Sequence, residues 1–167
     1  MSIRIGILTI SDRSSRGERP DDSGPALVKA VNQQGWQVIR NGILPDEMEL
    51  IMNSLIEWAD SGDMDVILTS GGTGFSPRDI TPEATLAVIQ RIAPGLAEAM
   101  RSASLHITPH AMLSRATAGI RARTLIVNLP GSPRGAVENL AVIVPILPHA
   151  VELLRDEPSA EHGHSSV

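Results

Sequence analysis

Short, nearly unbroken apolar segments alternate with segments of helical pattern, and this alternation limits the possible folds more than any other feature of the chain. Three such segments, residues 3–10, 65–70 and 124–129, are rich in β-branched side chains and end at polar or glycine residues. Strands that read as continuous apolar runs are typical of parallel sheets with both faces buried. The pattern therefore predicts an α/β fold with a mainly parallel central sheet covered by helices on both faces.

Capping residues and apolar periodicity place the other elements. Helices are expected over residues 23–35, 45–62, 81–93, 95–105 and 135–154 (with breaks near Pro145 and Pro148), and a further strand over 36–44. Residues 116–123 fit either a short strand or a hairpin. No internal repeat or long linker is present. A length of 167 residues predicts a single domain, residues 1–155, and a polar tail, residues 156–167, expected to be flexible.

Composition excludes several classes of site and partner. The chain has no Cys, which rules out disulfides, thiolate metal sites and a Cys nucleophile. A net charge of −5 and 2% aromatic residues argue against a nucleic-acid partner. No apolar run approaches the length of a membrane span, and no secretory signal precedes the first strand. We therefore expect a cytoplasmic protein with no membrane and no nucleic-acid partner.

Polar segments follow four of the predicted strands, at residues 11–13, 44–46, 70–79 and 130–133. In parallel α/β sheets, ligands bind outside the carboxyl ends of the strands. These four segments are therefore expected to lie along one edge of the sheet and to form the binding site.

Gly71-Gly72-Thr73-Gly74 follows a buried strand and could serve either a ligand or the fold. Glycines there permit positive φ and close approach of a ligand, and successive N–H groups can form an anion-binding nest. The alternative is an ordinary tight turn between a strand and a helix. The segment matches neither a phosphate-binding P-loop nor the dinucleotide fingerprint.

Asp79 and Asp46 are the carboxylates that could carry chemistry. Thr81 is the expected helix N-cap, followed by Pro82, so Asp79 is free to bind Mg²⁺ beside a phosphate nest. The alternative for Asp79 is a salt bridge or a turn hydrogen bond. Asp46 fits an acidic capping box with Glu49, which would by itself explain a structural role.

Other polar residues have simpler interpretations. Ser11 and Asp12 are expected in turn chemistry at the end of the first strand. A solvated loop surface is the interpretation given to Arg13, Arg16, Arg19, Asp21 and Asp22. The five His do not form a metal set. The chain has no nucleophile elbow, so covalent catalysis has little support.

Six motifs in order resemble the molybdopterin adenylyltransferases of molybdenum-cofactor biosynthesis, which include bacterial enzymes and domains of plant and animal two-domain proteins. The motifs are Ser11-Asp12-Arg13, Asp22-Ser23-Gly24-Pro25, Leu44-Pro45-Asp46-Glu47, Ser70-Gly71-Gly72-Thr73-Gly74 with Pro77-Arg78-Asp79-Ile80-Thr81-Pro82-Glu83-Ala84, Met112-Leu113-Ser114-Arg115, and Asn128-Leu129-Pro130-Gly131-Ser132-Pro133. The resemblance covers residues 3–155. It implies a three-layer α/β/α sandwich, a homotrimer, transient contact with other cofactor-biosynthesis proteins, and transfer of AMP from ATP to molybdopterin with Mg²⁺.

The resemblance also implies roles for individual residues. Asp46 and Asp79 match the acidic positions tied to Mg²⁺ and catalysis. The nucleotide-binding loops correspond to Gly71, Gly72, Thr73 and Gly74 and to Pro130, Gly131 and Ser132. The segments that line the site correspond to Ser11 and Asp12 and to Ser114 and Arg115. Many members have Asn at the position of Ser132, and the related molybdate-insertion enzymes have Ser at the position of Gly74.

Two alternative functions remain open at this point. One is a non-catalytic molybdopterin-binding oligomeric module on the same fold. The other is a nucleotide-cleaving enzyme that consumes ATP or a dinucleotide without molybdopterin. A test for release of pyrophosphate that depends on molybdopterin would distinguish the adenylyltransferase from both alternatives.

Overall fold

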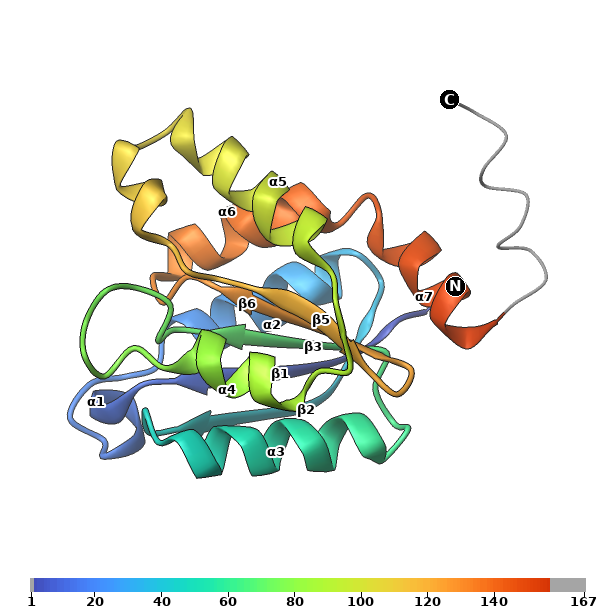
Figure 1. Cartoon of the computed structure of the whole chain (residues 1–167), viewed down its shortest axis with the longest axis horizontal. Helices are drawn as coiled ribbons and strands as arrows, with labels where there is room; N and C mark the ends of the chain where they lie inside the picture. Colours follow the sequence, from blue (N-terminus) through green and yellow to red (C-terminus); the bar gives the residue numbers. More distant parts are fainter. Residues whose placement is uncertain (1, 157–167) are drawn as a thin grey trace.

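The computed structural model describes residues 2–156, so most of the tail predicted over residues 156–167 lies outside the described residues. The elements, in chain order, are β1 (Arg4–Ile10), α1 (Asp12–Ser15), α2 (Ser23–Gln33), β2 (Gln37–Leu44), α3 (Met48–Asp60), β3 (Val66–Ser70), α4 (Thr81–Val88), β4 (Arg91–Ile92), α5 (Pro94–Leu105), the 3₁₀ helix η1 (Pro109–Leu113), β5 (Ala118–Arg121), β6 (Thr124–Leu129), α6 (Pro133–Ile143) and α7 (Leu147–Arg155). Strands and helices alternate as the sequence predicts (Figure 1).

Within the described residues, the strands form one six-stranded sheet in the order β2-β1-β3-β6-β5-β4. Neighbours among β2, β1, β3 and β6 pair in parallel, whereas β5 is antiparallel to both β6 and β4. The prediction of a mainly parallel sheet is confirmed. The ambiguous residues 116–123 contain β5 and its tight connection to β6, so the hairpin interpretation is the correct one.

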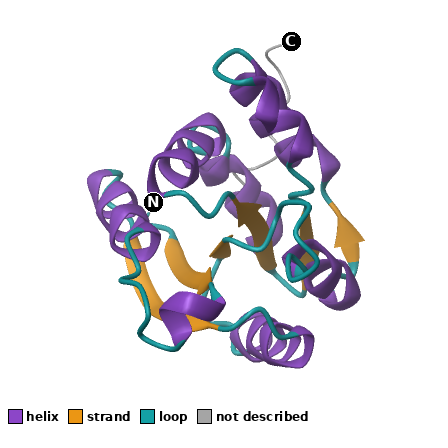
Figure 2. Cartoon of the chain, turned by 90° about the vertical axis from the view of Figure 1, so that its left-hand side faces the viewer, coloured by secondary structure: helices purple, strands orange, loops and turns teal. Residues whose placement is uncertain are grey.

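Helices cover both faces of this sheet and make three layers, which confirms the expected α/β/α sandwich. Helices α2, α5, α6 and α7 pack on one face, and α3 and α4 on the other (Figures 1 and 2). Alternating side chains of one strand serve the two cores, because successive residues point to opposite faces. In β1, for example, Ile5 and Ile7 join the first core and Leu8 and Ile10 the second. All five residues of β3 are buried, as expected for a central parallel strand.

Two predicted helices have different boundaries in the structure, and one helix was not predicted. Helix α3 begins at Met48 with Glu47 as its N-cap, so Asp46 does not cap it. Helix α4 ends at Val88 instead of Ala93, because the N–H groups of Gln90 and Ala93 bond to β5 and residues 91–92 join the sheet. The polar loop after β1 contains a short helix, α1, which the sequence pattern did not indicate.

The N-cap predicted at Thr81 is also wrong. Ile80 occupies that position, and Thr81 begins the helix with its hydroxyl buried and without a hydrogen-bond partner. At the end of the chain, the helical segment breaks at residues 144–146, next to Pro145, as expected. The second predicted break is absent, because Pro148 lies in the first turn of α7, where a proline ring fits a helix.

No single helix among the described residues is long and apolar enough to cross a membrane. Helices α6 and α7 reach the required length only as a pair, with a bend of 64° between them.

Candidate functional site

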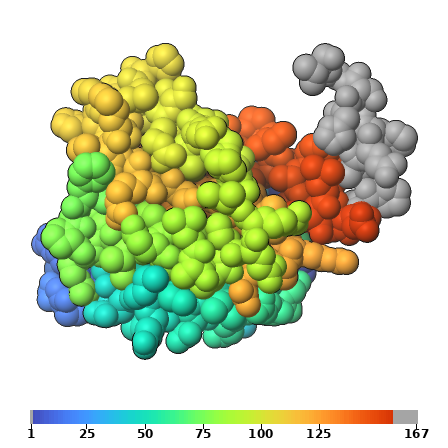
Figure 3. Space-filling view, viewed as in Figure 1, coloured from blue at the N-terminus to red at the C-terminus, as the bar shows by residue number. Residues whose placement is uncertain are grey.

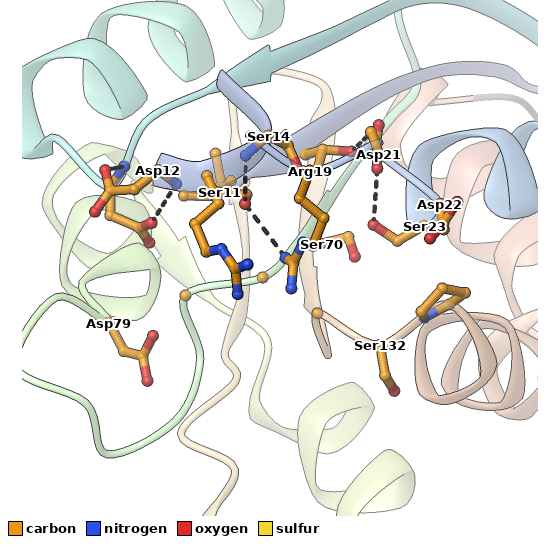
Figure 4. A pocket seen from close by; sticks show the side chains of 18 of the residues that line it. Ser11, Asp12, Ser14, Arg19, Asp21, Asp22, Ser23, Ser70, Asp79 and Ser132 are labelled. Carbon is orange, nitrogen blue, oxygen red and sulfur yellow. Dashed lines mark hydrogen bonds between the residues drawn. The ribbon is translucent and has the colours of Figure 1, made fainter. Parts of the chain in front are cut away.

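A pocket of about 690 Å³ lies at the carboxyl ends of the parallel strands. Each of the four segments that were predicted to meet there contributes to its wall. The predicted site residues that line it are Ser11, Asp12, Asp46, Gly71, Gly72, Asp79, Gly131 and Ser132. Figure 4 shows the carboxylates of Asp12 and Asp79 on one side of the pocket and Ser132 on the other. The structure thus brings these residues together in one pocket at the predicted edge of the sheet.

Glycines bring the loop after β3 close to the site carboxylates. Gly71 and Gly72 have φ of +106° and +66°, a region that glycine adopts without strain. A Cβ atom on Gly72 would lie 3.0 Å from Oδ1 of Asp46, and a Cβ on Gly74 would lie 2.9 Å from Oδ2 of Asp79. Each glycine thus leaves room for one carboxylate. The N–H of Gly71 donates to the carbonyl of Leu129, so it does not belong to an anion nest.

Asp12 and Asp46 tie the first two loops together by reciprocal hydrogen bonds. The N–H of Asp12 donates to Oδ2 of Asp46, and the N–H of Asp46 donates to Oδ1 of Asp12, each with a donor–acceptor distance of 3.0 Å. Asp46 therefore has a structural role, but it is this crosslink between loops rather than the predicted helix cap.

The two carboxyl groups are perturbed in opposite directions. The pKa of Asp46 is raised, first because the group is partly buried and then because the charges of Asp12 and Asp79 disfavour a third negative charge nearby. The pKa of Asp12 is lowered, mainly by its hydrogen bonds with Arg78. A cation bound by Asp46 would offset the part of this rise that comes from the neighbouring negative charges.

Arg78 is a site residue that the sequence analysis did not single out. Its guanidinium donates to both carboxylate oxygens of Asp12 at 2.9 Å and to Glu47 at 3.0 Å. Since Arg78 precedes Asp79, this contact joins the glycine-rich loop to the loop after β1. The signal in the sequence was its position beside Asp79.

The far side of the pocket is polar. Arg19 and Asp22 are exposed there, as the interpretation of a solvated loop surface predicts, whereas Asp21 is only partly exposed and bonds to protein groups. Arg19 lies 3.4 Å from the Ser11 hydroxyl (Figure 4). Asp21 accepts hydrogen bonds from the Thr9 hydroxyl, the Ser23 hydroxyl and the N–H of Gly24. The pair of Asp residues before a helix was the available signal, since such residues satisfy free N–H groups at helix starts.

Ser132 caps helix α6. Its hydroxyl accepts a hydrogen bond of 3.1 Å from the N–H of Gly135, so the side chain already has a structural partner. Gly131, Ser132 and Pro133 line the pocket, which places the N-terminus of an 11-residue helix at its edge. The backbone N–H groups and dipole at such a terminus favour phosphate groups.

A second, smaller pocket of about 290 Å³ adjoins the first and shares Ser132 with it. The other predicted residues that line it are Thr73, Gly74, Ser114 and Pro130. Arg115 lines neither pocket, and its guanidinium instead contacts the backbone of the glycine-rich loop. The expectation that Arg115 lines the site is therefore not supported by its position.

The donor set suits Mg²⁺ that is shared with a phosphate ligand. Among the described residues, no group of three or more Asp, Glu, His or Cys is placed to hold a metal. Mg²⁺ normally binds through one or two carboxylates, completed by waters and substrate phosphates. Asp46 and Asp79 each use Oδ2 to accept a backbone N–H, which leaves Oδ1 of each for a cation.

Comparison with known proteins assigns this chain to a family. A family model described as "Probable molybdopterin binding domain" matches residues 6–149. The chain belongs to this family. It is 43% identical over 155 residues to a molybdopterin adenylyltransferase from Helicobacter pylori, covering 92% of this chain and 88% of that relative. A molybdopterin biosynthesis enzyme MoaB from Thermus thermophilus has the same fold, with a TM-score of 0.88, 49% identity, and coverage of 93% of this chain and 98% of that one.

Longer relatives contain a similar segment within a larger protein. Gephyrin from Dictyostelium discoideum is 43% identical over 93% of this chain, and the cinnamon protein from Drosophila melanogaster is 44% identical over 95%. The match covers 23% and 26% of those two proteins, so the chain spans about a quarter of their length. The members of this molybdopterin-binding family thus include both short and multidomain proteins.

Proposed function

We propose that this protein is a molybdopterin adenylyltransferase, which transfers AMP from ATP to molybdopterin and releases pyrophosphate. The observation that carries the proposal is that Asp46 and Asp79 both line the pocket at the strand ends, Asp46 beside Gly72 and Asp79 beside Gly74 of the glycine-rich loop. The similarity to the H. pylori adenylyltransferase over most of both chains supports the same reaction.

The chemistry requires alignment of two anions. An oxygen of the terminal phosphate of molybdopterin attacks the α-phosphorus of ATP and forms a new P–O bond. The bond from the α-phosphorus to the bridging oxygen breaks, and pyrophosphate leaves with the electron pair. The nucleophile is already ionised, so the site needs positioning and charge neutralisation rather than a strong base.

Residues on this chain can meet those needs. Asp46 and Asp79 would hold Mg²⁺, which supplies positive charge to the phosphates of ATP when it is bound. The N-terminus of α6, at Gly131 and Ser132, would receive phosphate oxygens. Two adjoining pockets that share Ser132 are suited to a reaction with two substrates.

The test is release of pyrophosphate by purified protein with ATP, Mg²⁺ and molybdopterin. We expect wild-type turnover to depend on molybdopterin, and Asp79→Asn to reduce it by about 100-fold or more at saturating Mg²⁺, since charge stabilisation by a metal contributes several kcal/mol. Asp63→Asn, at an exposed position, is the matched control and should retain activity. Full activity of Asp79→Asn would refute the metal role.

The same assay separates the alternatives. Binding of molybdopterin without release of pyrophosphate would indicate a non-catalytic module. Consumption of ATP in the absence of molybdopterin would indicate a nucleotide-cleaving enzyme. The presence of Asp46 and Asp79 in the lining of one pocket favours an enzyme over the module.

We also propose that the protein assembles as a homotrimer, as its family resemblance implies. Exposed apolar side chains at the end of α5 and along η1 support self-association, and they are Leu105, Ile107, Met112 and Leu113. These segments form one protruding corner of the molecule (Figure 3). Contiguous exposed apolar surface commonly marks an interface. Light scattering of the purified protein would give the oligomeric state, and Met112→Glu, at an exposed position that does not line the second pocket, should lower it if this corner is the interface.

A further inference from the structure

The loop that carries Asp79 is held from behind by a residue outside both pockets. Arg115 follows η1, and its backbone N–H donates to the carbonyl of Thr73 at a distance of 2.8 Å. Its Nε donates to the carbonyl of Gly74 at 2.8 Å, and its Nη2 donates to the carbonyl of Asp79 at 2.6 Å. One side chain thus bonds to both ends of the loop from residue 74 to residue 79.

These contacts fix the separation of the two loop ends. A guanidinium is planar and its donors have a rigid arrangement, so the carbonyls of Gly74 and Asp79 must keep one spacing to bond to it together. The carboxylate of Asp79 then lies directly over Gly74, where a Cβ would be 2.9 Å from its Oδ2. The same carboxylate accepts the N–H of Ser76, which closes the turn inside the loop.

Glu83 orients the guanidinium from the opposite side. Its two carboxylate oxygens accept hydrogen bonds from Nη1 and Nη2 of Arg115, and these bonds lower the pKa of Glu83. Glu83 lies in the first turn of α4, directly after the loop. With Nε, Nη1 and Nη2 all bonded to protein atoms, Arg115 has little capacity left for a substrate.

We propose that Arg115, oriented by Glu83, is a positioning residue that sets the geometry of Asp79 for its cation. It acts through the backbone of the loop and does not touch the nucleotide or the pterin. This inference rests on the proposed function for its turnover readout alone, because the position of Asp79 and its cation affinity can be measured without the reaction.

The test compares Arg115→Ala and Arg115→Lys with a matched control, Arg121→Ala. Arg121 makes contacts of the same kind away from the loop, with two hydrogen bonds to the carboxylate of Asp60 and one to the carbonyl of Val88. Binding of Mn²⁺, in place of Mg²⁺, would be measured by electron paramagnetic resonance with α,β-methylene-ATP present. Hydrogen exchange would be followed over residues 73–81.

We expect Arg115→Ala to weaken Mn²⁺ binding by about tenfold or more, the usual effect of losing a residue that orients a metal ligand. Exchange over residues 73–81 should become faster in the same variant. Arg121→Ala should leave Mn²⁺ affinity within about twofold of wild type. The Mn²⁺ affinity of Arg115→Lys should lie between those of wild type and Arg115→Ala, since an ammonium lacks the fixed spacing of donors that bonds to both carbonyls.

Other outcomes would overturn the inference. Faster exchange with unchanged Mn²⁺ affinity would show that Arg115 only stabilises the loop. Weaker binding of α,β-methylene-ATP without Mn²⁺, with Mn²⁺ affinity unchanged, would make Arg115 a substrate ligand. Failure of wild type to bind Mn²⁺ with the analogue would also refute it.

Failure of the proposed function gives a different result. If wild type releases no pyrophosphate with molybdopterin, but Arg115→Ala still weakens Mn²⁺ binding, the positioning role stands and the proposed reaction is wrong. If wild type is active and the variant keeps both its Mn²⁺ affinity and its activation constant for Mg²⁺, the reaction stands and the positioning role is wrong.

Discussion

Asp65 offers a sharp test of what stabilises the fold, because it lies at the opposite edge of the sheet from the site. It precedes β3, and its side chain is 4% exposed. Arg4 and Arg155 donate to its carboxylate through at least five hydrogen bonds, one of them from the backbone N–H of Arg4. The carboxylate therefore joins β1 and the last helix, α7, to the central strand.

We expect Asp65→Asn to lower the free energy of unfolding by about 3 kcal/mol. Breaking a buried ion pair costs about 3–5 kcal/mol, and the lower end applies because Arg4 and Arg155 are 38% and 26% exposed and can turn to water. Asn has one acceptor oxygen in place of two and presents an amide to a guanidinium. For a chain of this size, the expected fall in Tm is about 6–12 °C.

The effect should also depend on pH in a defined direction. Burial raises the pKa of Asp65, but the hydrogen bonds from Arg4 and Arg155 outweigh it, and the net pKa lies below the ordinary value of 3.8. A carboxyl whose folded pKa is lowered stabilises the protein above its unfolded pKa, and this contribution is lost as the pH falls through the folded pKa. The difference between wild type and variant should be full at pH 7 and shrink below about pH 4.

Urea unfolding of wild type and Asp65→Asn at pH 7, at about pH 4 and at about pH 3 would measure this, with Asp60→Asn as the control. Asp60 also pairs with an arginine, Arg121, but is 44% exposed, so its loss should lower the free energy of unfolding much less than the loss of Asp65 does. The reasoning would be refuted if the two variants lost equal amounts of unfolding free energy. It would also be refuted if the loss for Asp65→Asn stayed constant down to acid pH. Activity of Asp65→Asn at 25 °C should match wild type, since the residue is far from the pocket.

Three further predictions follow from the site and its supports. Asp46→Asn should be at least as stable as wild type at pH 7. The raised pKa of Asp46 means that ionisation of this carboxyl destabilises the fold as the pH rises, and Asn carries no charge. Urea unfolding would measure this, and a clear loss of stability in the variant would contradict it. The apparent affinity of wild type for Mg²⁺ should weaken as the pH falls through the raised pKa of Asp46, because a protonated carboxyl does not bind a cation. Titrations of activity with Mg²⁺, or of Mn²⁺ binding, at several pH values would measure this. Gly71→Ala should lower the free energy of unfolding by more than about 2 kcal/mol, since its Cβ would lie 2.2 Å from the carbonyl oxygen of Ile10 at φ +106°. Gly17→Ala, with open space around the new Cβ at φ +72°, should lower it by about 1 kcal/mol. Equal losses for the two variants would contradict the steric explanation.

Local sequence patterns predicted most of the framework. The apolar runs at residues 65–70 and 124–129 are buried on both faces, and their composition is enough to require a sheet with two covered faces. Parallel pairing then places the polar residues after each strand at one edge. Asp12, Asp46 and Asp79 could therefore be assigned to one site before their contacts were known.

Predictions failed where a partner distant in sequence satisfied the backbone. The apolar pattern of α4 continues past Val88, but Gln90 and Ala93 bond to β5, so the chain leaves the helix. Capping rules likewise assigned Asp46 to the start of α3, whereas its carboxylate accepts the N–H of Asp12 instead. Both failures have the same cause, since a local rule does not include a competing partner that the fold brings into contact.

The sequence by itself determined the class of sheet, the edge that carries the pocket, and several of the carboxylates and glycines that line it. Those features follow from periodicity and from the chemistry of single residues, which short segments contain. Tertiary structure decided which side chains line the pockets and which bond only to protein atoms. Arg115 resembles a site residue in sequence, yet it supports the loop of Asp79 from behind, because that choice depends on which backbone carbonyls lie within reach of its guanidinium once β5, η1 and the glycine-rich loop are packed together.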